Sequence, residues 1–147
     1  MNWLIYLIAV GAGSANPFQS GANAQLNKVL QKPLPTTLFV YASGLLGVLL
    51  IWIFVRQSLP SSNELSRVPW WAWLGGIFSI ASTMAGLVFA QKLGSGIFTG
   101  LNVTAALVVS VLLDHFGWFH LPEHAINIWR VAGAALMIGG VVLITRN

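Results

Sequence analysis

The sequence predicts an all-α integral membrane protein with five transmembrane helices, and three observations lead to this fold class. Only 7% of the 147 residues are Asp, Glu, Lys or Arg, whereas about a quarter of an average soluble domain is charged. The charges separate long apolar segments, and four of these contain no charge at all: residues 1–27, 33–55, 68–91 and 93–113. A fifth segment, 125–145, contains only Arg130. Because these runs are continuously apolar, they indicate helices and not the alternating strands of a barrel.

Each segment is near or above the roughly 20 residues that a helix needs to cross a bilayer. We therefore expect a single transmembrane domain over residues 1–147, with spans at about 2–30, 36–55, 70–91, 95–114 and 127–145. The first span is longer than a bilayer requires. Since Pro17 lacks a backbone donor and clashes with the preceding turn, we expect a helix break or kink around Gly13–Pro17.

Two features mark the ends of the later spans. Residues 56–69 form the most polar segment and predict an exposed loop. Pro69 then precedes Trp70, Trp71 and Trp73, which are typical of an aromatic belt at the membrane interface. Asn127 is the expected N-cap of the last span.

Amide side chains gather on one face of the first span. At 100° per residue, Asn16, Gln19, Asn23 and Asn27 lie within about 80° of arc. Amides in hydrocarbon need partners or water, so this face predicts either a solvated substrate path or hydrogen bonds that only hold helices together. An interrupted helix at Pro17 favours the path, because such interruptions expose backbone groups beside transporter sites.

Spans 3 to 5 have small residues at helical spacing, which favour close helix packing and in part dimer contacts. These residues are Gly75, Ser79, Ser82, Gly86, Gly96, Gly100, Gly133 and Gly140. Asn102 is the exception, because it shares a face of the fourth span with Thr99 and Ala106. It is a candidate substrate contact or a packing residue.

The remaining polar residues exclude several function classes. The seven Lys and Arg residues are scattered at span ends, so we expect no nucleic-acid partner. Asp114 and Arg130 should lie on the same membrane side and can form an ion pair, snorkel separately to the interface, or take part in proton coupling. The spacing of His115, His120 and His124 matches no compact metal site. With no nucleophile beside a base, we expect neither enzymatic activity nor a metal or other cofactor.

Several segments together resemble the bacterial YdcZ family of the drug/metabolite transporter superfamily. They are Gln19-x-x-x-Asn23-x-x-Leu26, Ser43-x-x-x-Gly47, Pro69-Trp70-Trp71-Ala72-Trp73-Leu74-Gly75-Gly76, Leu93-Gly94, Leu113-Asp114-His115-Phe116-Gly117 and Arg130-x-x-Gly133. The resemblance covers nearly the whole chain. The sequence departs from the family at Ala105-Ala106, where members often have a Gly-Gln pair. If that Gln contributes to substrate contact in the family, either substrate specificity differs in this chain or Asn102, one turn earlier, substitutes for it.

The resemblance implies a five-span unit of the bacterial cytoplasmic (inner) membrane that works in pairs. The pairs are antiparallel homodimers or two oppositely oriented paralogues. It also implies kinship with small multidrug resistance transporters, which have a Glu in span 1 for proton coupling. Span 1 of this chain contains no acid, so coupling by the same device is not expected.

The distribution of charge favours the antiparallel pair. One side would hold Lys28, Lys32, Lys92 and Arg146, and the other would hold three arginines at 56, 67 and 130. Four against three is almost no bias. We therefore expect insertion in both orientations and a dual-topology homodimer with inverted symmetry.

The favoured function is a secondary transporter that moves a small organic or cationic solute out of the cell by alternating access as a dimer. Its expected substrate contacts are Asn16, Gln19, Asn23 and Asn102. Two alternatives remain: a passive small-solute channel, and a non-transporting membrane scaffold or accessory subunit.

Overall fold

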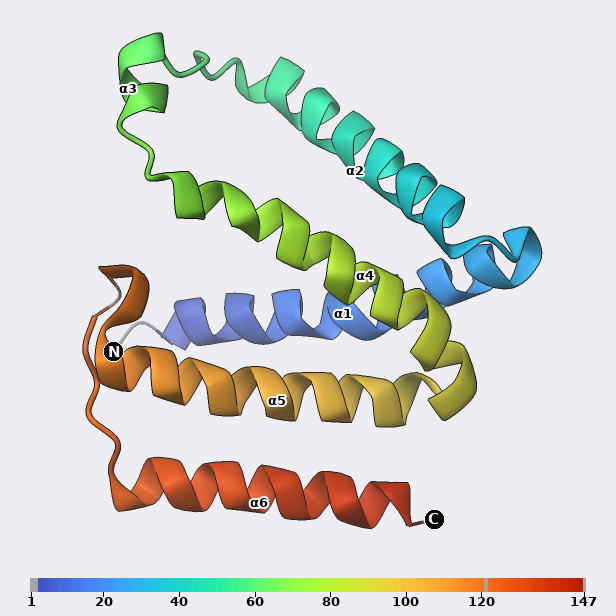
Figure 1. Ribbon diagram of the computed structural model, residues 1–147, viewed down its shortest axis with the longest axis vertical. Coiled ribbons are helices and arrows are strands. Elements are labelled where there is room, and N and C mark those ends of the chain that lie inside the picture. The colour runs from blue at the N-terminus through green and yellow to red at the C-terminus, as the bar shows by residue number, and fades with distance from the viewer. Residues whose placement is uncertain (1–2, 121, 147) are drawn as a thin grey trace. The chain divides into compact units, whose positions relative to one another are not determined.

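The computed structural model describes residues 3–120 and 122–146 (Figure 1). These residues form two compact units. The first comprises Met1–Pro17 and Leu93–Asn147, and the second comprises Phe18–Lys92. Helix α1, Trp3–Leu30, belongs to both units, because the division falls directly after Pro17. The backbone remains helical through Pro17, so this proline lies inside a helix and does not end one.

In the second unit, α1 is followed by α2, Pro33–Val55, the short helix α3, Ser62–Ser66, the 3₁₀ turn η1, Trp70–Trp73, and α4, Leu74–Leu93. Pro33 is the first residue of α2, where a missing N–H costs no helical bond. Arg56 ends α2 in the left-handed conformation, and its N–H donates to Trp52 O. The chain turns from α1 into α2 within two residues, Gln31 and Lys32.

In the first unit, α5, Ser95–Phe116, and α6, Ile128–Thr145, lie side by side and are joined through the 3₁₀ turn η2, Trp118–His120 (Figure 1). Asn127 caps α6 as predicted, since its Oδ1 accepts a hydrogen bond from Arg130 N at 2.9 Å. Gly117 ends α5 with a φ of 59°. A Cβ at this position would lie 2.7 Å from Glu123 Cγ, so the turn requires glycine.

The all-α membrane fold is confirmed by four helical segments that are long and apolar enough to cross a bilayer. They are Pro33–Val55, Trp70–Leu93, Ser95–Phe116 and Ile128–Thr145. Helix α1 is not among them, because its amides lower its hydropathy. With 28 residues it is nevertheless the longest helix of the described chain, at roughly 42 Å from 1.5 Å per residue.

The polar segment 56–69 differs from the expected loop. Its residues are exposed, but Ser62–Ser66 forms α3 within it. Ser61 and Glu64 build a capping box, in which Ser61 N donates to Glu64 Oε2 at 2.7 Å. The Ser61 backbone N–H and then its hydroxyl lower the pKa of Glu64 below its ordinary value of 4.5. The signature Ser-x-x-Glu was present in the sequence and was missed.

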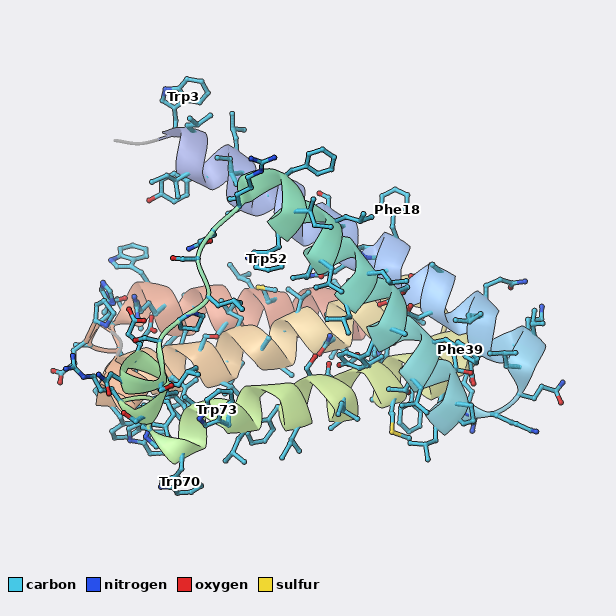
Figure 2. The ribbon with its side chains drawn as sticks, turned by 90° about the horizontal axis from the view of Figure 1, so that it is seen from above. Trp3, Phe18, Phe39, Trp52, Trp70 and Trp73 are labelled. Carbon is cyan, nitrogen blue, oxygen red and sulfur yellow. The ribbon has the colours of Figure 1, made fainter. Side chains whose placement is uncertain are left out.

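Large aromatic side chains are exposed at the start of α4 and along α1 and α2 (Figure 2). Trp70 and Trp73 lie on η1, where the aromatic belt was predicted, and both are exposed. Trp52 donates its indole N–H to Gln57 O at 2.6 Å, directly after the end of α2. These amphipathic rings suit the boundary between hydrocarbon and headgroups.

The small residues of the later spans divide into two groups. A Cβ at Gly100 would lie 3.3 Å from Val141 Cγ2, so Gly100 allows α5 and α6 to approach. At Gly75, Gly96, Gly133 and Gly140 a Cβ would meet no described atom within 4 Å. Gly100 therefore serves the packing of α5 against α6, and Gly86 is buried in α4. Dimer contacts of the other glycines stay a prediction.

Candidate functional site

The amide face of α1 contains side chains in two different environments. Asn16 and Gln19 are exposed and Asn23 is half-buried, whereas Asn27 is only 8% exposed. The first three form no side-chain hydrogen bond with any other described residue, and Asn27 forms two. The predicted amide face is thus divided into an open part, Asn16, Gln19 and Asn23, and a buried, hydrogen-bonded part, Asn27.

Asn27 closes the end of α1 against α4 within the second unit. Its Nδ2 donates to Leu87 O at 3.1 Å, and Leu87 is fully buried. Thr36 of α2, also fully buried, shares its single hydroxyl hydrogen between Lys32 O at 2.8 Å and the more distant Asn27 Oδ1 at 3.4 Å. One turn earlier on α1, Ala24 O accepts a hydrogen bond from Gln91 Nε2. Asn27 is therefore a structural residue, as the packing interpretation of the amides required.

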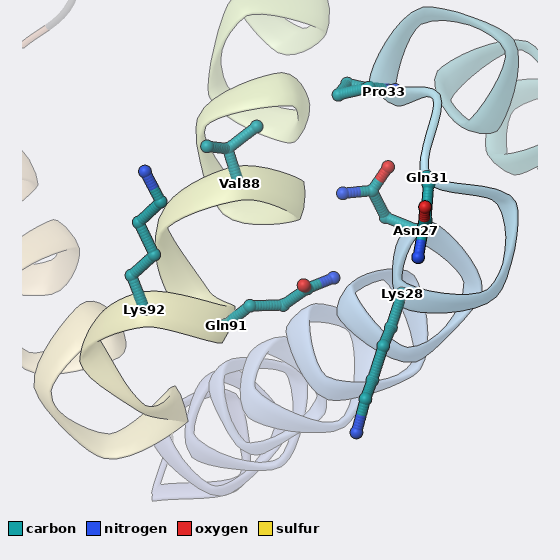
Figure 3. A pocket seen from close by; sticks show the side chains of 7 residues that line it. All are labelled: Asn27, Lys28, Gln31, Pro33, Val88, Gln91 and Lys92. Atoms are coloured by element: carbon teal, nitrogen blue, oxygen red, sulfur yellow. The ribbon is translucent and has the colours of Figure 1, made fainter.

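A pocket of about 300 Å³ opens beside this network. Its lining residues come from the ends of α1 and α4 and from the start of α2 (Figure 3): Asn27, Lys28, Gln31, Pro33, Val88, Gln91 and Lys92. The amides of Asn27 and Gln91 point toward the space between α1 and α4 (Figure 3). The sequence interpretation did not predict this pocket, because its residues are adjacent only after the helices pack.

A second polar cluster joins α2 to α4. The hydroxyl of Tyr41 lies 2.6 Å from Ser79 Oγ and 3.2 Å from Thr83 Oγ1. Ser79 was expected to serve helix packing as a small residue, and it also supplies a hydrogen-bond partner between α2 and α4. The available signal was the spacing of Ser79 and Thr83, which places two hydroxyls on one helix face four residues apart.

Asn102 lies on α5 in the first unit and is exposed. It has no side-chain hydrogen bond to another described residue, and neighbouring Thr104 is buried. The hydroxyls of Thr99 and Thr104 also have no hydrogen-bond partner in the described chain. Asn102 thus resembles Asn16, which belongs to the same unit, in being exposed and in having no side-chain hydrogen bond to a described residue.

The structure brings Asp114 and Arg130 together at the end of α5 and the start of α6. Arg130 Nη1 lies 3.4 Å from Asp114 Oδ2 and 3.1 Å from His124 O. Both side chains are about one third exposed, at 28% for Arg130 and 33% for Asp114. A partly solvated pair of this kind fastens a turn at the interface and contributes little to stability.

The histidines near this turn hydrogen-bond to the backbone. His115 Nδ1 accepts from Ile126 N at 3.3 Å, and His124 Nδ1 lies 3.0 Å from Pro122 O. The side chain of His120 lies outside the described residues. His115 and His124 therefore act in the α5–α6 turn itself.

Comparison with known proteins adds to these observations. A family profile described as "Putative inner membrane exporter, YdcZ" matches residues 4–143. The chain is 24% identical to "Inner membrane protein YdcZ" of Escherichia coli strain K12, over 98% of this chain and 95% of that protein. No solved structure matches the chain. The match and the apolar helices together make it a multi-pass inner membrane protein with a transporter-like role. The chain belongs to the YdcZ family.

Proposed function

We propose that this protein exports a small organic or cationic solute by alternating access, with the open amides of α1 as substrate contacts. The observation that carries the proposal is the contrast along one helix face. Asn27 is buried and hydrogen-bonded, whereas Asn16, Gln19 and Asn23 form no side-chain hydrogen bond with described residues. Placing an amide in hydrocarbon without a hydrogen-bond partner raises the free energy by roughly several kcal/mol. The open part of the face therefore meets water, substrate or a second chain.

The chemistry of this face suits neutral or cationic solutes. Amide oxygens accept hydrogen bonds from ammonium and hydroxyl groups, and amide nitrogens donate to carbonyl groups. The described part of α1 contains no acid and its one basic residue, Lys28, lies in the last turn. Binding by this face thus involves no fixed charge, and proton coupling through a carboxylate on α1 is not part of the mechanism.

The proposed functional unit is an antiparallel homodimer, or a pair with an oppositely oriented paralogue. Two α1 helices would then face one central cavity, and inverted symmetry would supply the two access states. The near-even distribution of Lys and Arg, four on one side and three on the other, supports insertion in both orientations.

Counterflow in proteoliposomes tests the proposal. An unlabelled organic cation such as tetraphenylphosphonium, loaded inside the vesicles, should accelerate uptake of the same labelled cation from outside. The other cations of a panel are tested in turn in the same way. A passive channel would conduct without this stimulation by trans substrate. A scaffold would show no flux above protein-free vesicles.

Single substitutions locate the site. Asn16→Ala, Gln19→Ala and Asn23→Ala should each lower exchange, whereas Asn63→Ala should not. Asn63 is a matched control because it is an exposed amide on α3, outside the predicted spans. Exchange that survives all three α1 substitutions would contradict the assignment of this face.

A further inference from the structure

The pocket at the end of α1 and α4 has an unbalanced charge. Two lysines, Lys28 and Lys92, line it from different helices, and no carboxylate lines it. The acid of the same unit, Glu64, lies on α3 beyond the opposite ends of α2 and α4 and already accepts hydrogen bonds from Ser61. The ion pair found among the described residues joins Asp114 and Arg130 in the other unit. The lysines of the pocket therefore have no acidic side chain of their own unit beside them.

Neutral donors complete the lining. Asn27 is more than nine-tenths buried, and only one of its two amide hydrogens is used by Leu87 O. Gln91 likewise gives one amide hydrogen to Ala24 O and retains a second. Both amides point into the space between α1 and α4 (Figure 3). Fixed N–H donors with flanking ammonium groups are the usual means of binding an oxyanion.

Gln31 supports a binding role for the same pocket. It has a φ of 53°, in the left-handed region, and its N–H donates to Asn27 O at 2.7 Å directly after α1. Glycine is the residue that adopts this position without strain. Glutamine here places a third amide in the pocket wall, where a glycine would have no side chain.

We propose that this pocket binds a phosphate-type anion, supplied by the headgroup of an acidic phospholipid or by free phosphate. It lies where α1 and α4 end and α2 begins, at the expected depth of the headgroups, and Pro33 and Val88 give it an apolar wall. Its volume of about 300 Å³ is roughly ten times the volume of one liquid water molecule, so a hydrated phosphate group fits. In Figure 3 the ammonium groups of Lys28 and Lys92 extend away from the centre, and their flexible stems allow them to turn inward.

Two arms of one experiment distinguish the sources. In the first, native mass spectrometry of the purified full-length chain compares retention of phosphatidylglycerol with that of phosphatidylcholine. In the second, inorganic phosphate is titrated in zwitterionic detergent and the shift in Tm is followed. Lys28→Gln and Lys92→Gln should each weaken anion binding by about fivefold. Lys28→Arg and Lys92→Arg, which keep the charge, should retain most of it.

Lys32→Gln is the matched control. Lys32 lies in the same turn and the substitution removes the same charge, but Lys32 does not line the pocket. Gln31→Gly should also weaken binding, although the backbone conformation at that position favours glycine.

Loss of phosphatidylglycerol alone on Lys28→Gln supports the lipid, and loss of the phosphate effect alone supports the free anion. Equal retention of both lipids together with no phosphate effect overturns the proposal, as does a Lys32→Gln effect equal to that of Lys28→Gln. A role limited to helix ends would lower Tm in both lysine variants and leave binding unchanged, and that result also overturns it. This site is independent of the proposed transport activity.

Discussion

Replacing Asn27 with Ala removes the side chain that joins α1 to α4. The change deletes the 3.1 Å hydrogen bond from Nδ2 to Leu87 O. The Leu87 carbonyl is not orphaned, because as an interior residue of α4 it also accepts from its own helix. Thr36 is not orphaned either. Its hydroxyl has a single hydrogen, and the 2.8 Å bond to Lys32 O takes precedence over the 3.4 Å contact with Asn27 Oδ1.

The loss of stability in Asn27→Ala is therefore limited to one hydrogen bond and a small packing defect. One interhelical hydrogen bond in a membrane contributes about 0.6 kcal/mol on average and up to about 1.7 kcal/mol. Loss of a buried amide also leaves a small void beside Leu87, whose side chain is fully buried. We therefore expect Asn27→Ala to lower the free energy of unfolding by about 1–2 kcal/mol.

The assay is equilibrium unfolding of the full-length chain in mixed micelles of dodecyl maltoside and sodium dodecyl sulfate, followed by tryptophan fluorescence and circular dichroism. Asn23→Ala is the matched control, since Asn23 lies on the same helix face and has no side-chain hydrogen bond to a described residue. Its effect should stay within about 0.5 kcal/mol. If Asn23→Ala destabilised the protein as much as Asn27→Ala, the division of the face into structural and open amides would be refuted.

Three further predictions concern other parts of the chain. Gly100→Leu should destabilise the α5–α6 pair by about 1–3 kcal/mol through overpacking, because even a Cβ at this position lies 3.3 Å from Val141 Cγ2; Gly96→Leu, where a Cβ meets no described atom within 4 Å, is the control in the same unfolding assay, and an equal loss would contradict the packing. Asp114→Asn should cost about 0–1 kcal/mol, since the ion pair with Arg130 is partly solvated and His124 O remains a partner; a loss well above this range would show that the pair has more than a local role. The hydrogen bonds of Ser61 lower the pKa of Glu64, so their contribution to α3 is fully present above 4.5, the ordinary value, and is lost as pH falls through the lowered pKa. Hydrogen exchange of the Leu65 amide should therefore accelerate over this pH range relative to Glu64→Gln, which does not titrate, and identical pH profiles of the two proteins would contradict the capping box.

The fold could be predicted from sequence because membrane insertion is a local requirement. Charge-free runs of about 20 residues specify helices without any knowledge of their partners. The ends of helices were also accessible where one residue makes the cap, as at Asn127. The capping box at Ser61 and Glu64 was equally local and was overlooked because the surrounding segment is so polar.

The site was less accessible because it depends on contacts between helices. The amide face of α1 followed from a period of 3.6 residues, but nothing in that period separates Asn27 from Asn23. The difference arises from Leu87 and Thr36, which lie 60 and 9 residues away along the chain. The bond between Tyr41 and Ser79, 38 residues apart, has the same character. Asp114 and Arg130 were easier to pair because a single short connection joins their helices.

Cysteine accessibility tests whether the open amides of α1 are in contact with water, and the chain contains no cysteine of its own that would react. Single cysteines at positions 16, 19 and 23 would be treated in intact membranes with a water-soluble, membrane-impermeant thiol reagent, which reacts with thiolates in contact with water. Phe18→Cys and Gly21→Cys, on the other side of α1, are the controls; a Cβ at Gly21 would meet no described atom within 4 Å. We expect rapid modification at 16, 19 and 23 and slow modification at 18 and 21. Positions 16, 19 and 23 that are as inert as 18 and 21 would show that the amides are sealed in a packed interface, and the proposed substrate path would be wrong.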